Sequence, residues 1–116
     1  MSLWRYNNVE LEVDMEDVDF QERYENAFNR MGETEKELQK VGSLSGITRE
    51  YCHMFYQLFD DIFEPGTGEK LFNGKCNIRL VDEAFDSFLN HCKKEVDAAN
   101  KRRMNTVKKY RVAKKR

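Results

Sequence analysis

Residues 44–63 read LSGITREYCHMFYQLFDDIF, and this stretch decides the fold. Its apolar side chains recur at steps of three and four residues: Leu44, Ile47, Tyr51, Met54, Phe55, Leu58, Phe59, Ile62 and Phe63. That spacing places them on one broad face of an α-helix, which has 3.6 residues per turn. Pro65 and Gly66 follow directly and stop the helix. We therefore predict that residues 44–63 form the core helix of a mainly helical protein.

Two further helices are predicted on either side of this core helix. Residues 17–41 have a thin apolar stripe, an N-cap at Asp17 or Asp19 and a stop at Gly42. Residues 78–100 follow a capping asparagine and have a stronger apolar face. The glycine-rich connection over 64–77 is expected to be a loop with at most one short turn. The predicted core comprises Tyr51, Phe55, Leu58, Phe59 and Ile62 against Val81, Phe85, Phe88 and Leu89, covered by Tyr24 and Phe28.

A β-hairpin is predicted over residues 3–13. Val9, Leu11 and Val13 alternate with glutamates, which is the pattern of a half-buried strand. Asn7 and Asn8 precede this run, and asparagine tolerates the positive φ angles of a two-residue hairpin turn. Two strands alone are only marginally stable in water. We therefore expect this hairpin to pack on the helices or on another subunit.

The charge is divided sharply between the body and the end of the chain. Of the 116 residues, 20 are Lys or Arg and 21 are Asp or Glu, so the net charge is −1. Every acidic residue lies at or before Asp97, which gives residues 1–100 a net charge of −10 and residues 101–116 a net charge of +9. We expect residues 1–100 to form one compact domain. Because its like charges repel and it has few apolar residues, the basic tail 101–116 is expected to be frayed or disordered when unbound.

Several classes of protein are excluded by composition and patterning. No uncharged stretch approaches the ~18 apolar residues that span a bilayer, and the N-terminal residues lack the apolar region of a signal peptide. The three cysteines are odd in number and widely spaced, as expected for reduced thiols. We therefore expect a cytoplasmic protein that has no membrane partner.

Candidate sites for metals, nucleotides and catalysis are all weak. Cys52-His53 and His91-Cys92 resemble a zinc ligand set, but adjacent helix residues point ~100° apart and do not readily share one metal. The Gly68–Gly74 segment encloses one residue too many for a phosphate-binding loop and lacks its Ser or Thr. No catalytic Ser-His-Asp or Cys-His pattern is present among two histidines. The sequence predicts no enzyme, metal, cofactor or small-molecule substrate.

Two charged segments are candidate partner-docking sites. Asp60, Asp61 and Glu64 crowd the C-terminal end of the core helix, where the helix dipole disfavours negative charge. They either pair locally with Lys70, Lys75 or Arg79 or form a docking patch for a basic partner. The second candidate is the basic tail, with Lys101, Arg102, Arg103, Lys108, Lys109, Arg111, Lys114, Lys115 and Arg116. It could dock on protein, bind nucleic acid phosphates or remain solvated.

The order of segments is similar to that of a known family. YNNVELEV at 6–13, FYQLFDDIFEPGTGEKLFNGKCN at 55–77 and NIRLVDEAFDSFL at 77–89 carry the similarity, which covers most of residues 4–100. The chain resembles a family of small uncharacterised proteins of phages and prophages of Firmicutes bacteria. These look like tail assembly chaperones encoded between the tail-tube and tape-measure genes. The shared residues contain no catalytic signature, and this tail is richer in lysine than the family pattern.

The resemblance implies a non-enzymatic helical protein of the bacterial host cytoplasm. Such chaperones coat the tape-measure protein before tail-tube subunits assemble around it, self-associate, and are often made in two lengths by ribosomal frameshifting. Tape-measure and tail-tube proteins and further copies of this chain are therefore the expected partners. Two alternatives remain: a nucleic-acid-associated regulator that acts through the basic tail, and a structural virion component such as a head–tail connector.

Overall fold

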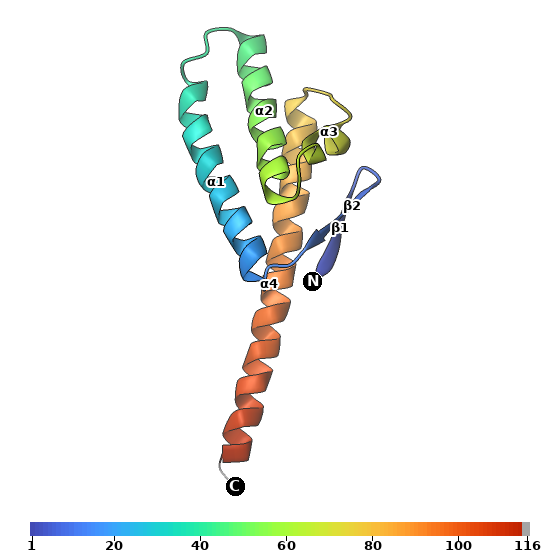
Figure 1. The fold of residues 1–116 in the computed structure, drawn as a ribbon, viewed down its shortest axis with the longest axis vertical. Coiled ribbons are helices and arrows are strands. Elements are labelled where there is room, and N and C mark those ends of the chain that lie inside the picture. Colours follow the sequence, from blue (N-terminus) through green and yellow to red (C-terminus); the bar gives the residue numbers. More distant parts are fainter. Residues whose placement is uncertain (115–116) are drawn as a thin grey trace.

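A small hairpin packs on a set of helices in the computed structural model, which describes residues 1–114. The elements in chain order are β1 (Ser2–Tyr6), β2 (Val9–Val13), α1 (Val18–Leu38), α2 (Leu44–Ile62), α3 (Thr67–Phe72) and α4 (Ile78–Lys114) (Figure 1). The predicted fold class, mainly helical with an N-terminal β-hairpin, is confirmed.

The hairpin is closed by the two asparagines that the sequence singled out. β1 and β2 are antiparallel, with Trp4 opposite Leu11. Asn7 and Asn8 have φ angles of 48° and 62°, the left-handed values that a two-residue turn of this kind requires. Directly opposed residues share a face, and Trp4 and Val13 are buried on the face that meets the helices. The hairpin therefore contributes to the core.

α1 and α2 form an antiparallel helical hairpin (Figure 1). Asp17, one of the two residues predicted as the N-cap, caps α1 by accepting a hydrogen bond from the Phe20 N–H at 3.2 Å. α1 ends at Leu38 and α2 at Ile62, slightly before the predicted boundaries. Past Leu38 the chain makes i→i+3 hydrogen bonds, from the Lys40 N–H to Glu37 and from the Val41 N–H to Leu38. This tighter turn replaces the last helical turn that the sequence predicted.

α3 is a short helix inside the segment that we expected to be mainly loop. Gly66 has a φ of 92° at its start, a conformation that favours glycine. A Cβ atom at Gly68 would lie 2.8 Å from the Cα of Tyr56, so α3 packs tightly against α2 only because this residue is glycine. Leu71 and Phe72 at its end are buried. The glycines that suggested a loop thus allow a close helix–helix contact.

α4 is a single helix of 37 residues, whereas we predicted a helix that ends near Asn100 and a frayed tail. Residues 101–114 contain no glycine or proline and are rich in lysine and arginine, which are good helix formers. The unfavourable nucleation step is already completed in the packed half of α4. Adding further turns therefore costs little, and the repulsion between like charges does not interrupt the helix.

The core lies where α2, α4 and β1 meet. Phe55, Leu58, Phe59, Ile62, Val81 and Phe88 are buried as predicted, while Tyr51, Phe85, Tyr24 and Phe28 are half-buried against them. Leu89 is not part of the buried cluster. Trp4, Phe20, Leu71 and Phe72 also belong to the core, although the predicted core did not include them.

Candidate docking surface

The last part of α4 extends away from the rest of the molecule. Figure 1 shows this half of the helix continuing alone beyond the start of α1. We call residues 101–114 the arm. Every residue from Asn100 to Lys114 is exposed, whereas Ala99 just before them is buried. The arm therefore offers its whole circumference to a partner, and it gives the molecule a long dimension of 69 Å.

The arm carries most of the predicted docking residues. Because successive helix residues differ by ~100° in direction, its cations face all sides of the helix. They are Lys101, Arg102, Arg103, Lys108, Lys109, Arg111 and Lys114. Arg102 forms an ion pair with Glu16 in the turn before α1, which ties the base of the arm to the body. Lys115 and Arg116, also predicted to dock, lie outside the described residues.

Apolar side chains alternate with these cations. Met104, Val107, Tyr110 and Val112 are between 47% and 63% exposed. The Lys114 ammonium lies 5.8 Å from the centroid of the Tyr110 ring, a distance typical of a cation–π contact. The arm therefore combines electrostatic attraction with apolar surface that a partner could bury.

A hollow lies where the arm leaves the body. Its volume is about 410 Å³, and it is lined by Met15, Gln21, Tyr24, Glu25, Val96, Ala99, Asn100 and Arg103. These residues come from the turn before α1, from α1 and from α4. The hollow mixes apolar and charged groups in the same way as the arm, so it extends the candidate docking surface onto the body.

The predicted acidic cluster is engaged within the molecule. Asp60 accepts a hydrogen bond from the Gly68 N–H at 2.8 Å and so fixes the start of α3. Asp61 pairs with Arg30 of α1 at 3.3 Å. Glu64 pairs with Lys70 at 3.9 Å and is exposed. Of the predicted local pairs, Glu64 with Lys70 is therefore formed, and Asp60 and Asp61 connect elements of the body.

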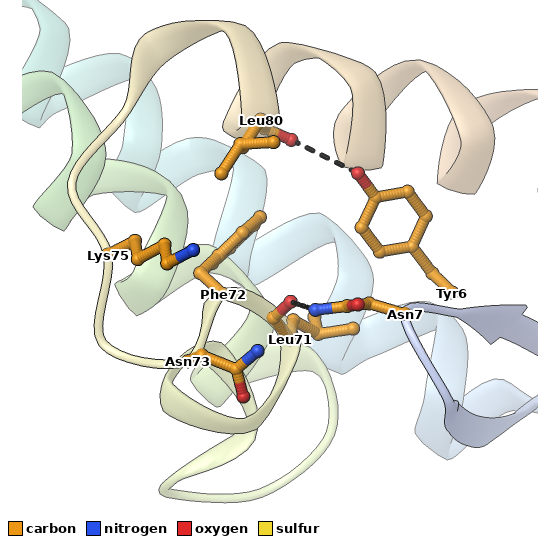
Figure 2. Close-up of a pocket in the computed structure, with 7 residues that line it drawn as sticks. All are labelled: Tyr6, Asn7, Leu71, Phe72, Asn73, Lys75 and Leu80. Atoms are coloured by element: carbon orange, nitrogen blue, oxygen red, sulfur yellow. Dashed lines mark hydrogen bonds between the residues drawn. The ribbon is translucent and has the colours of Figure 1, made fainter.

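A pocket of about 340 Å³ lies at the tip of the hairpin. Figure 2 shows Tyr6 and Asn7 of the hairpin facing α3 and the start of α4 across it. The Asn7 side-chain amide donates to the Leu71 carbonyl at 2.9 Å, and the Tyr6 hydroxyl donates to the Leu80 carbonyl at 3.5 Å. Both polar groups thus bind backbone, and these two contacts anchor the hairpin to α3 and α4.

A serine and a histidine meet at the other end of the hairpin, a contact that no local sequence pattern indicates. Ser2 Oγ lies 2.7 Å from His91 Nε2 and also donates to Glu95. Since a hydroxyl has a single proton and Ser2 donates it to Glu95, the consistent arrangement has His91 Nε2–H donating to Ser2 Oγ. The second oxygen of Glu95 accepts from the Met15 N–H at 2.6 Å. This cluster therefore attaches the hairpin to α4.

The two Cys-His pairs that resemble a zinc ligand set are dispersed. Cys52 and Cys92 are buried, whereas His53 is exposed and His91 contacts Ser2. Burial raises the pKa of the Cys92 thiol to about 12, with Glu95 adding to the effect. Within residues 1–114, no group of three or more His, Cys, Asp or Glu side chains is arranged to hold a metal ion. No helix in that range has the length and apolar character needed to cross a membrane.

Comparison with known proteins identifies one family. Neither a curated protein nor a solved structure matches this chain. A family model described as "Family of unknown function (DUF6673)" matches residues 7–116. The match includes the arm as well as the body. The chain belongs to the DUF6673 family.

Proposed function

We propose that this protein is a non-enzymatic, chaperone-like assembly factor of a phage or prophage tail, acting in the cytoplasm of the bacterial host. Its partners in this proposal are the tape-measure and tail-tube proteins and further copies of itself. The resemblance of residues 4–100 to tail assembly chaperones motivates the biological setting. The observation that carries the binding role is the arm, a helix with four exposed apolar side chains and cations on every side.

Exposed apolar side chains on an unaccompanied helix favour binding to another protein. Met104, Val107 and Tyr110 follow each other at intervals of three residues, so they lie along one side of the arm. This side offers apolar surface that becomes buried when a second helix packs beside the arm, while Val112 lies on another side. The cations between them attract acidic segments of that partner and set its orientation. A helical partner with acidic residues flanking an apolar stripe fits this surface best.

Further copies of the chain also fit. The exposed residues of α1 include Asp19, Glu22, Glu25, Glu33 and Glu37. These acids and the arm of another copy have opposite charge. An arm bound to α1 of the next copy makes a head-to-tail contact, and repetition of such a contact gives rings or open spirals.

Co-expression with the neighbouring tape-measure and tail-tube proteins tests this proposal. A variant with serine at Met104, Val107, Tyr110 and Val112 should lose the co-purifying partner. The matched control places serine at Leu3, Val18, Leu44 and Ile47, four exposed apolar residues of the body. This control should retain the partner. Absence of both partners from the purified wild-type protein contradicts the proposal, as does equal loss in both variants.

Nucleic acid binding is a second candidate, favoured by the position of the arm's cations. Fourteen helical residues extend ~21 Å at 1.5 Å per residue. The Debye length is ~8 Å at physiological ionic strength, so the end of the arm is screened from the acidic body. Salt-sensitive binding of a duplex, measured by fluorescence anisotropy and abolished by truncation after Asn100, would support this candidate. Equal binding by the truncated protein would reject it.

A structural virion component is the remaining alternative. A chaperone leaves the tail after assembly, whereas a connector subunit stays in it. Mass spectrometry of purified mature particles therefore separates the two. Detection of this chain at structural stoichiometry would favour the virion component over the assembly factor.

A further inference from the structure

One face of α2 is covered by the loop between α3 and α4. Thr48, Cys52 and Tyr56 lie on this face, since they follow each other at intervals of four residues. The Cys76 thiol donates to the Thr48 carbonyl at 3.7 Å, and the Tyr56 hydroxyl donates to the Lys75 carbonyl at 2.6 Å. The two contacts lie one turn before and one turn after Cys52. Lys75 and Cys76 therefore lie directly over Cys52.

The two thiols consequently lie close together at this contact. Cys52 is fully buried, whereas Cys76 is exposed to solvent. Burial raises the pKa of Cys52, and the two thiols are near enough for Cys76 to contribute to this rise. The third thiol, Cys92, is buried in α4 near Tyr24 and Glu95. An oxidant in solution therefore reaches Cys76 first, and Cys52 is the thiol best placed to react next.

We propose that Cys52 and Cys76 form a reversible intramolecular disulfide when the protein meets a low-molecular-weight disulfide such as oxidised glutathione. Cys76 first loses its proton to solvent, and its thiolate attacks one sulfur of the oxidant. The oxidant's S–S bond breaks, and one small thiolate leaves and takes a proton from water. Cys52 then loses its proton and attacks the Cys76 sulfur, which releases the second small thiol. The two cysteines are oxidised by two electrons and the small disulfide is reduced to two thiols.

This disulfide would join α2 to the segment that leads directly into α4. Asn73–Asn77 contains no helix or strand, and Asn73 and Gly74 have positive φ angles of 53° and 69°. Such a loop can adjust to the geometry of a cross-link more easily than two packed helices can. The bond therefore fixes the N-terminal end of α4 against the α1–α2 hairpin, and the unfolded chain loses entropy.

The second step should be slow at neutral pH. Burial is the largest cause that raises the pKa of Cys52 to about 12 in the reduced protein, and burial still acts once Cys76 is in the mixed disulfide. Little Cys52 thiolate is present near pH 7, so the mixed disulfide at Cys76 should accumulate first. Its conversion to the intramolecular bond should accelerate roughly tenfold per pH unit between pH 7 and 9. Samples quenched at successive times, alkylated and examined by mass spectrometry distinguish the mixed disulfide from the intramolecular disulfide.

The test is incubation of the full-length protein with oxidised glutathione, followed by alkylation and tryptic digestion without reductant. The expected product joins peptide 50–70, which contains Cys52, to peptide 76–79, which contains Cys76, while Cys92 is alkylated. The Tm of the oxidised protein should rise by roughly 5 °C or more and return on reduction. Cys76→Ser should abolish the cross-link, and Cys92→Ser should retain it.

Three results would overturn the inference. One is a Cys52–Cys92 link, which would mean that the buried thiols meet each other. Another is a mixed disulfide at Cys76 that persists at pH 9, and the third is a dimer linked through Cys76 of two chains. Because Cys76 is exposed, Cys76→Ser should fold normally, so circular dichroism of this variant separates a lost cross-link from a lost fold.

Discussion

The indole ring of Trp4 lies nearly parallel to the ring of Phe59, with 5.6 Å between the centroids and 19° between the planes. The edge of Phe88 meets the same indole at a centroid distance of 5.1 Å. The indole N–H donates to Ser87 Oγ at 3.0 Å, so its only polar group is satisfied. Residues from β1, α2 and α4 therefore meet at Trp4, which joins the hairpin to both core helices.

Trp4→Ala should lower the free energy of unfolding by about 3–5 kcal/mol, the usual cost of removing a buried large aromatic side chain. Urea denaturation followed by circular dichroism at 222 nm measures this, since the variant lacks the chain's one tryptophan. Leu3→Ala is the control, because Leu3 is 46% exposed on the opposite face of β1. It should cost about 0.5 kcal/mol or less. Equal losses in the two variants would contradict the central position of Trp4.

The sequence predicted those features that arise from local patterns. Alternation at Val9, Leu11 and Val13 predicted the hairpin, and the spacing of residues 44–63 predicted the core helix. The partners of Trp4 and the contact between Ser2 and His91 were not predicted. These contacts join residues far apart in the chain, and the sequence around one residue does not indicate its distant partner.

The candidate docking surface was predicted in composition but not in conformation. The cations from Lys101 onward were identified from charge counting alone. Their helical conformation was not predicted, because nucleation and charge repulsion oppose a helix in an isolated segment of this composition. In the folded chain it extends a helix that Val81 and Phe88 already anchor in the core.

The turn of the hairpin offers a test of its backbone conformation. Asn8 has a φ of 62°, a left-handed conformation that costs most residues with a Cβ about 1–2 kcal/mol. Asn and Asp adopt it at lower cost, and Gly, which has no Cβ, adopts it freely. Asn8→Ala should therefore lower the free energy of unfolding by about 1 kcal/mol. Asn8→Gly should raise the free energy of unfolding by roughly a few tenths of a kcal/mol. Chemical denaturation of both variants measures the difference. A more stable Asn8→Ala than Asn8→Gly would show that this turn does not have a left-handed backbone.

Truncation after Asn100 should remove helix without weakening the body. Residues 101–114 are exposed. Arg102 forms an ion pair with Glu16 of the body, and this pair is lost on truncation. Exposed pairs contribute little, so the free energy of unfolding should change by about 0.5 kcal/mol or less. The circular dichroism signal at 222 nm should fall in proportion to the 14 lost helical residues. An unchanged total signal would show that the arm is not helical in solution.

Two tyrosines should make the fold sensitive to alkaline pH. Burial is the largest cause that raises the pKa of Tyr51 to about 12, and its 2.7 Å hydrogen bond to Asp82 adds to it. Burial, with the charge of Glu69, raises the pKa of Tyr56 to about 12. In the unfolded chain both lose their proton near pH 10. Their contribution to stability is therefore complete below pH 10 and is lost as the pH rises from 10 to 12.

Spectrophotometric titration at 295 nm measures these ionisations directly. In the native protein, Tyr51→Phe and Tyr56→Phe should each remove absorbance that appears near pH 12, and in urea each should remove absorbance that appears near pH 10. Tyr110→Phe, at an exposed residue of the arm, is the matched control for the loss of one phenol. The free energy of unfolding of Tyr51→Phe should fall less steeply than that of the wild type between pH 10 and 12. Equal decreases in the wild type and in Tyr51→Phe would mean that Tyr51 has the same pKa in the folded and unfolded chain. The hydrogen bond to Asp82 would then not raise that pKa.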